Sequence, residues 1–134
     1  MAPPNTNVLM YDDRFYCLNE ANLPFECHLL PDGTLKPVGY ETFGGLIDYP
    51  ISAHPQINAN NDLVFHSYTT NQELIDRDGT MKVGVYSASS KELKSYFVPN
   101  DGKDHVSFAH GLTYTNNFAI LWDCSVHFDH TREL

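Results

Sequence analysis

The chain has 134 residues and a net charge of −9, and 42% of its residues are hydrophobic and 13% aromatic. This composition excludes a disordered chain and favours β structure, and the length allows one domain with a modest core. The acidic balance, without a basic run, argues against nucleic-acid binding through neutralised phosphates. Cys17, Cys27 and Cys124 form an odd set without tight spacing, so we expect reduced, mostly packed thiols rather than a disulfide framework or a zinc finger.

Two hairpins are predicted in the first third of the chain. The apolar runs Asn7–Tyr11 and Phe15–Asn19 are separated by the polar residues DDR, which is typical of a hairpin. Phe25–Leu30 and Thr34–Val38 lie on either side of the sequence PDG, in which proline presets φ and glycine accepts a positive φ. We therefore expect four short strands here.

Strands and turns continue along the rest of the chain. Gln56–Asn58 and Leu63–Tyr68 are predicted strands around a polar turn. Thr80–Ser87 contains the two-residue alternation of a half-buried strand, and Leu93–Val98 follows as another. No segment keeps the period of an α-helix, and Ser89–Leu93 would form one helical turn at most. The prediction is an all-β fold.

One construction occurs twice, and each copy begins with a histidine. His54 and His110, 56 residues apart, each precede a short strand, a polar turn and an apolar strand, the second of which is Phe118–Cys124. In both copies an asparagine follows the histidine by seven residues, at Asn61 and Asn117. Two hairpins per unit and this unit length fit the four-stranded blades of a β-propeller. A sandwich would contain the same strands but would not explain the repeated histidine.

The matched histidines suggest a metal site. Residues at the heads of the innermost propeller strands point toward one axis, where His54 and His110 would converge on an iron, zinc or copper ion. A histidine beside proline is otherwise more often a packed or surface residue, and only the repeated position favours a ligand. The other histidines share no such position and are expected to be surface or structural residues: His28, His66, His105, His127 and His130.

A weaker third copy begins the chain and contains a candidate carboxylate. Aligning Asp13 with Asn61 places Thr6 where the two histidines stand. Glu20 ends a strand of this copy and belongs to no charged surface run. A metal-bound histidine normally needs a carboxylate or carbonyl on its other ring nitrogen, and Glu20 is the best-placed candidate. The alternative is a solvated carboxylate at a strand end.

Five short motifs, in order and at matching spacing, resemble those of one known family. They are Asn5-Thr6-Asn7-Val8, Leu18 to Phe25, Phe43-Gly44-Gly45, Ser52 to Ile57, and His110 with Thr115 and Asn117 to Ile120. They resemble the segments ANTNV, LxEAGLPY, FGG, SAHPKID and HDFAITENYAI of the carotenoid oxygenase family. That family includes carotenoid cleavage dioxygenases, lignostilbene dioxygenases and the retinal-pigment-epithelium isomerase. The resemblance covers about residues 2 to 130.

The resemblance implies a seven-bladed β-propeller, of which residues 1–134 form one partial domain of roughly two to three blades. Ferrous iron, Fe(2+), is held on the axis of such proteins by four histidines. His54 and His110 match the first and second of these ligands, and Glu20 matches a glutamate that orients a ligand histidine. The implied reaction uses O₂ to cleave a conjugated C=C bond of a carotenoid, apocarotenoid or stilbene into two carbonyl products. Peripheral membrane contact of the full-length protein is also implied, because such substrates dissolve in lipid.

The chain departs from the family pattern in two ways. Gly111 stands where the family usually has aspartate, which is expected to loosen the turn that aims His110. The third and fourth histidines of the family lie well beyond the second, and neither His127 nor His130 stands in a matching motif. We therefore expect a piece of the family that folds poorly and binds iron weakly when expressed alone, because propeller blades bury their faces against neighbours.

Other functions stay open on the sequence. The alternative of another class is a non-catalytic propeller fragment that binds a partner or an apolar ligand. A zinc hydrolase ranks third, because no water-activating carboxylate accompanies the histidines in a known zinc spacing. The N-terminal residues contain no basic region and no long apolar segment, so they are not expected to form a signal peptide, and no apolar run approaches the roughly 18 residues of a spanning helix. The location, cytoplasmic or plastid-like, stays open on the sequence.

Overall fold

The described part of the chain consists of strands and turns. The computed structural model describes residues 3–68, 81–98, 106–107, 109–122 and 127–128. The strands are β1 Asn7–Tyr11, β2 Arg14–Leu18, β3 Phe25–Leu29, β4 Leu35–Tyr40, β5 Gln56–Ile57, β6 Asp62–Tyr68, β7 Met81–Ser87, β8 Glu92–Phe97, β9 Val106–Ser107, β10 Leu112–Tyr114, β11 Ala119–Leu121 and β12 His127–Phe128. The predicted all-β class is confirmed. No helix in these residues is long and apolar enough to span a membrane.

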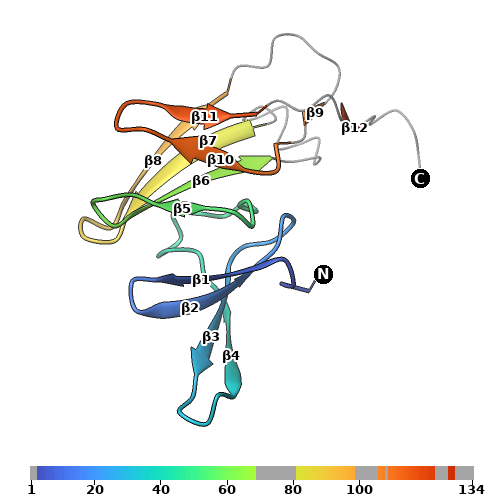
Figure 1. Ribbon diagram of the computed structural model, residues 1–134, viewed down its shortest axis with the longest axis vertical. Helices are drawn as coiled ribbons and strands as arrows, with labels where there is room; N and C mark the ends of the chain where they lie inside the picture. Colours follow the sequence, from blue (N-terminus) through green and yellow to red (C-terminus); the bar gives the residue numbers. More distant parts are fainter. Residues whose placement is uncertain (1–2, 69–80, 99–105, 108, 123–126, 129–134) are drawn as a thin grey trace.

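The strands form two complete antiparallel sheets that follow one another along the chain. The first has the order β1-β2-β3-β4 and the second β5-β6-β7-β8, while β10–β11 and β9–β12 are two-stranded. Figure 1 shows the two four-stranded sheets one beyond the other, with the β10–β11 hairpin beside the second. There the Tyr114 hydroxyl donates to the Ile57 carbonyl at 2.9 Å. The predicted unit of two hairpins is therefore present twice.

Turn chemistry explains where these strands end. Asp12 and Asp13 form the two-residue turn between β1 and β2 with φ values of 50° and 60°, as a tight hairpin of twisted strands requires. Asn61, in the turn between β5 and β6, has a φ of 61°. The alignment of Asp13 with Asn61 thus pairs two residues that both have a positive φ and both directly precede a strand, although the second turn is two residues longer. Between β7 and β8, the residues from Ala88 to Lys91 form a turn and not a helix.

The core lies between the two four-stranded sheets. Leu63 and Phe65 of β6 are 1% and 0% exposed and belong to one buried cluster with Tyr16 and Leu18 of β2. The connection from β4 to β5 is buried in the same cluster through Phe43, Ile47, Tyr49, Ile51 and Ala53. His54 lies near the end of this connection. Because the connection is packed in the core, the first candidate ligand is held between the two sheets.

One glycine makes room for the largest core ring. Gly84 lies opposite Phe65 in the β6–β7 ladder. A Cβ at Gly84 would lie 2.3 Å from the Phe65 ring, closer than real contacts allow. The absence of a side chain at this position therefore leaves the space that the Phe65 ring fills beside β7.

The described cysteines are free thiols, as predicted. Cys17 on β2 is partly buried and Cys27 on β3 is buried. Burial raises the pKa of the Cys27 thiol, and contact with Cys17 raises it further. Such thiols are packing residues rather than nucleophiles. Cys124 lies outside the described residues.

Alkaline titration of the core tyrosines provides a test of the sheet packing. Burial raises the pKa of Tyr11 to about 12, above the value of about 10 in an unfolded chain. The neutral phenol is favoured in the fold, so the stability it contributes is present below about pH 10 and is lost as the pH rises toward about 12. Tyr11→Phe is expected to lose the 3.2 Å bond to the Tyr86 carbonyl at every pH. The variant should show a shallower alkaline fall in its urea midpoint, and parallel profiles for variant and wild type would contradict the buried phenol.

Candidate metal centre

Glu20 follows the end of β2 and is held by its neighbours. The buried Asn19 accepts the Ala21 N–H at 2.8 Å through Oδ1 and donates to the Pro3 carbonyl at 2.8 Å through Nδ2. These bonds fix the turn after β2. The Glu20 carboxylate then reaches the connection between β4 and β5, where its Oε2 accepts the Ala53 N–H at 3.2 Å. With Oε2 engaged in this bond, Oε1 faces the two histidines.

The segment that carries His54 is clamped from both sides. Asn7 of β1 donates from Nδ2 to the Ala53 carbonyl at 2.8 Å, while Glu20 accepts the N–H of the same residue. Ser52 adds a local bond, because its Oγ accepts the His54 N–H at 3.0 Å. Ala53 and Ser52 are 0% and 1% exposed, so these bonds are shielded from water. The His54 backbone is thus fixed relative to the first sheet.

His110 reaches the same place from the segment before β10. Ala109 is buried, and its carbonyl accepts a hydrogen bond from the His66 Nε2 at 2.6 Å. Ser52 Oγ donates to the His110 carbonyl at 3.5 Å. Gly111 has no positive φ, and a Cβ there would meet no described atom within 4 Å. The turn that aims His110 therefore does not require glycine, and its geometry is held by the preceding contacts.

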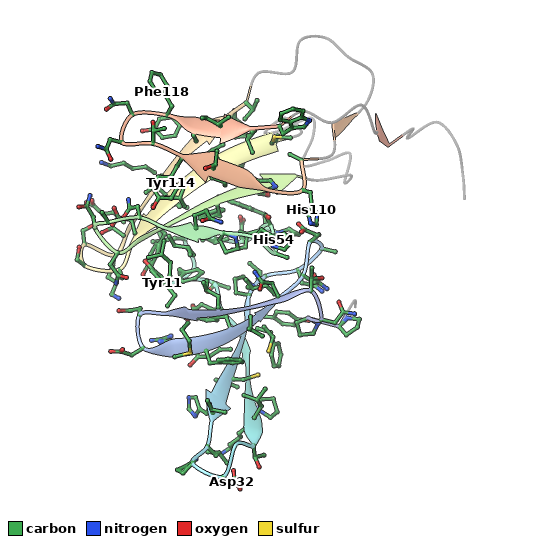
Figure 2. All side chains as sticks on the ribbon, viewed as in Figure 1. Tyr11, Asp32, His54, His110, Tyr114 and Phe118 are labelled. Atoms are coloured by element: carbon green, nitrogen blue, oxygen red, sulfur yellow. The ribbon has the colours of Figure 1, made fainter. Side chains whose placement is uncertain are left out.

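The three side chains converge on one point. Glu20 Oε1 lies 3.7 Å from His54 Nε2 and 3.6 Å from His110 Nδ1. The two imidazole rings have centroids 4.5 Å apart and are tilted by 56°. One candidate ligand atom from each residue lies within 4.8 Å of the others. Figure 2 shows His54 and His110 close together near the junction of the sheets, with Tyr11 at the other end of β1.

The residues present fit a metal ion. Glu20 Oε1 and His54 Nε2 are both buried, and neither has a hydrogen-bond partner among the described residues, since the 3.7 Å between them is too long for a hydrogen bond. Burying such atoms unsatisfied is costly, and a cation among them would remove the cost. Imidazole nitrogen with a nearby carboxylate suits iron, zinc or copper. The His110 side chain is 61% exposed, so the site is open on that side.

The other histidines differ in their surroundings. His28 on β3 has a side chain that is 62% exposed, 3.6 Å from Glu26, and lies on the surface as expected. His66 is fully buried and bonded to the Ala109 carbonyl, which fits the expected structural role. His105, His130 and the side chain of His127 lie outside the described residues.

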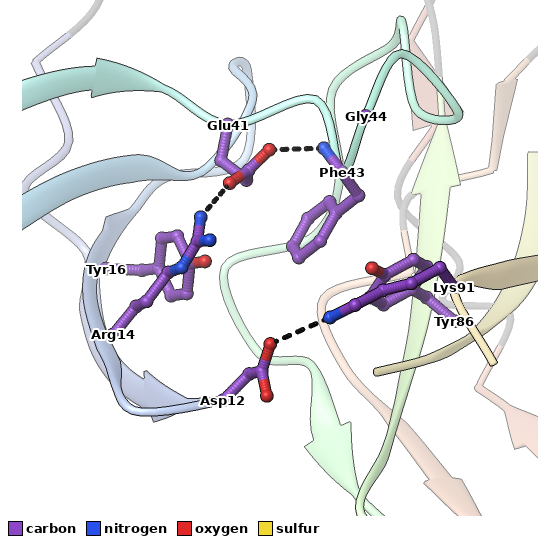
Figure 3. A pocket seen from close by; sticks show the side chains of 8 residues that line it. All are labelled: Asp12, Arg14, Tyr16, Glu41, Phe43, Gly44, Tyr86 and Lys91. Atoms are coloured by element: carbon purple, nitrogen blue, oxygen red, sulfur yellow. Dashed lines mark hydrogen bonds and ion pairs between the residues drawn. The ribbon is translucent and has the colours of Figure 1, made fainter. Parts of the chain in front are cut away.

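A separate cavity lies beside the β1–β2 turn, between Asp12 and Lys91 (Figure 3). It has a volume of about 290 Å³ and is lined by the aromatic rings of Tyr16, Phe43 and Tyr86 and by charged side chains. Arg14 forms an ion pair with Glu41 at 2.7 Å at the first sheet. Lys91 forms an ion pair with Asp12 at 3.1 Å, which joins the second sheet to the first. Both of these cations are already neutralised by carboxylates. The cavity is therefore a gap between the two sheets that the Lys91–Asp12 ion pair spans, and its described lining contains no histidine.

Some contacts at the centre were not predicted from the sequence. Asn7, Ser52 and His66 hold the segments that carry Glu20, His54 and His110. Asn7 and Ser52 belong to two of the five family motifs, so their place in these motifs could have indicated a role at the centre. A histidine in the apolar run of β6 was the only signal for His66.

Comparison with known proteins identifies the family. The family model described as retinal pigment epithelial membrane protein matches residues 2–134. Resveratrol cleavage oxygenase 1 of Botryotinia fuckeliana is 30% identical over 123 residues, which are 87% of this chain and 20% of that protein. Carotenoid 9,10(9′,10′)-cleavage dioxygenase of Crocus sativus is 22% identical over 130 residues, 92% of this chain and 21% of that protein. The chain spans about a fifth of the length of these relatives.

Solved structures show the same fold. Lignostilbene dioxygenase of Pseudomonas brassicacearum superposes with a TM-score of 0.69 at 20% identity, over 90% of this chain and 24% of that one. A cobalt-substituted Synechocystis ACO superposes with a TM-score of 0.63 at 23% identity, over 88% and 24% of the two chains. The two four-stranded sheets are therefore blades of part of a seven-bladed β-propeller, as predicted. The chain belongs to the carotenoid oxygenase family.

Proposed function

We propose that this chain supplies part of a non-haem ferrous iron centre in an oxygenase that cleaves a conjugated C=C bond. The observation that carries the proposal is the meeting of Glu20, His54 and His110, where two buried polar atoms have no hydrogen-bond partner in the part of the chain that the structure describes. The substrate class is a carotenoid, apocarotenoid or stilbene, because named relatives cleave resveratrol and carotenoids. The partners are then an apolar small molecule and O₂, with peripheral membrane contact in the whole protein.

Each residue has a distinct role in this proposal. His54 offers the lone pair of its buried Nε2. Glu20 Oε1 lies 3.6 Å from His110 Nδ1, and in the metal-bound site it would accept a hydrogen bond from Nδ1–H, so that Nε2 of that ring would bind the ion. The Ala53 N–H holds the other oxygen of Glu20, so the carboxylate keeps its orientation. Bound iron would supply the activation of O₂, and the protein supplies the ligand geometry.

A cobalt titration tests the proposal without depending on turnover. Co²⁺ is the probe because a structural neighbour is described as cobalt-substituted. One Co²⁺ ion is expected to bind the purified chain weakly, because the chain supplies two histidine ligands, and to give the absorption bands of nitrogen ligation. Glu20→Gln should weaken binding about 10–100-fold, as is usual for loss of a carboxylate that orients a ligand histidine.

Glu26→Gln is the matched control for this titration. The Glu26 side chain is 13% exposed, against 19% for Glu20, and pairs with Arg14 on the first sheet. It should leave the cobalt affinity unchanged. Failure of the wild-type chain to bind cobalt would refute the metal centre and leave a non-catalytic propeller fragment as the better description.

A further inference from the structure

We propose that His66 is a positioning residue that sets the separation of His54 and His110. His66 would not contact the ion itself. It would position the two segments that carry the ligands by hydrogen bonds to Ala109 and Ser52. The inference rests on the proposed metal centre. It assigns a role to a histidine that no motif of the family resemblance contains.

His66 occupies the middle of a central strand. It lies in β6 and pairs with Val83 of β7, within a four-stranded sheet. Its side chain is 0% exposed. A buried imidazole is costly unless it is hydrogen-bonded, so a histidine in this apolar strand needs a partner. The central strand fixes the position of His66, and its buried imidazole is expected to form a hydrogen bond with a neighbouring segment.

The side chain of His66 holds the second ligand segment. Its Nε2 lies 2.6 Å from the Ala109 carbonyl, one residue before His110. A carbonyl oxygen can only accept, so Nε2 carries the proton and donates it. The bond joins β6 to a segment 43 residues away in sequence. The start of the His110 segment is thus tied to the second sheet.

The main chain of the same residue holds the first ligand segment. The His66 carbonyl accepts the Ser52 N–H at 2.8 Å. Ser52 Oγ in turn accepts the His54 N–H at 3.0 Å and donates to the His110 carbonyl at 3.5 Å. Two hydrogen bonds therefore lead from His66 to His54, and one leads to the neighbour of His110. One residue, His66 of β6, is therefore bonded to both of the segments that carry the candidate ligands.

This arrangement matters because two imidazoles must aim at one ion. The ring centroids are 4.5 Å apart, and a small shift of either backbone would misdirect a nitrogen. Removing the His66 donor would leave the buried Ala109 carbonyl without this bond, and the His110 segment would then be held mainly by the longer 3.5 Å bond from Ser52. The His54 segment would keep its main-chain bond to β6. The expected defect is therefore in metal affinity, through His110.

The test compares three variants of the chain by cobalt affinity and by urea unfolding. His66→Phe keeps a planar ring but removes the donor, and should weaken Co²⁺ binding about 10–100-fold. His66→Gln places an amide N–H near the former Nε2 and should restore affinity to within about threefold. Leu63→Ala, in the same strand but facing the core, should lower stability and leave the affinity unchanged.

The outcomes separate this inference from the proposal on which it depends. If wild type does not bind cobalt, the metal centre itself is wrong. If wild type binds and a folded His66→Phe binds equally well, the positioning role is wrong. The role is also wrong if affinity falls in Leu63→Ala as much as in His66→Phe, since affinity would then only follow stability. Should His66→Phe not fold, His66→Asn replaces it, because its shorter amide cannot reach Ala109 and the same loss is expected.

Discussion

Replacing Phe65 by alanine is expected to lower the free energy of unfolding by about 3–5 kcal/mol. The ring is 0% exposed and lies between the two four-stranded sheets, in one cluster with Tyr16 and Leu18. Its removal would leave a cavity that β7 cannot fill, because the facing residue is Gly84. A loss of this size is a large part of the stability of a small domain. Urea unfolding followed by near-ultraviolet circular dichroism would measure it.

Phe118→Ala is the matched control for this core substitution. Phe118 lies in the turn before β11 and is 71% exposed, so the same chemical change should cost no more than about 0.5 kcal/mol. Gly84→Ala tests the same contact from the other side and should cost about 1–3 kcal/mol by overpacking. Equal effects of Phe65→Ala and Phe118→Ala would show that the two sheets do not pack as described.

Removing either candidate ligand is expected to have the largest effect on metal binding. His54→Ala deletes the buried Nε2, and His110→Ala deletes the ring beside it. Each should weaken Co²⁺ binding by more than about 100-fold, beyond the loss that follows removal of an orienting partner. The double variant should show no specific binding in the same absorption titration. Stability should change less in these variants than in Phe65→Ala, because both rings are partly exposed.

His28→Ala provides the control for the ligand variants. Its side chain is 62% exposed on β3, far along the first sheet from Glu20, and should leave cobalt affinity unchanged. If the affinity of His54→Ala or His110→Ala equalled that of wild type, that histidine would not be a ligand. If His28→Ala weakened binding as much as they do, the measured cobalt would be bound at surface imidazoles.

Local chemistry explains how much of the fold could be predicted. The strands from Asn7 to Tyr40 agree with the predicted hairpins to within one or two residues, because the DD and PDG turns define their ends. The matched turn conformations of Asp13 and Asn61 agree with the predicted repeat. The approach of His54 and His110 follows from the same repeat, since equivalent positions of successive blades face one axis. That these residues bind a metal stays a prediction.

Long-range contacts explain what could not be predicted. Asn7 bonds a carbonyl 46 residues away, and His66 bonds one 43 residues away. No periodicity or turn rule encodes such pairs, because they depend on how one sheet packs on the next. In the sequence, His66 is only one of several histidines that occupy no matching position in the two repeats. Its burial in β6 and its bond to Ala109 became visible only in the folded chain.

The most direct test of the metal centre is an anomalous difference map at the iron edge, from crystals of the chain grown with Fe²⁺. We expect one peak within bonding distance of His54 Nε2 and of a ring nitrogen of His110, with Glu20 beside it. A map whose only iron peaks lie at other side chains, with these three residues ordered and bare of metal, would contradict the account.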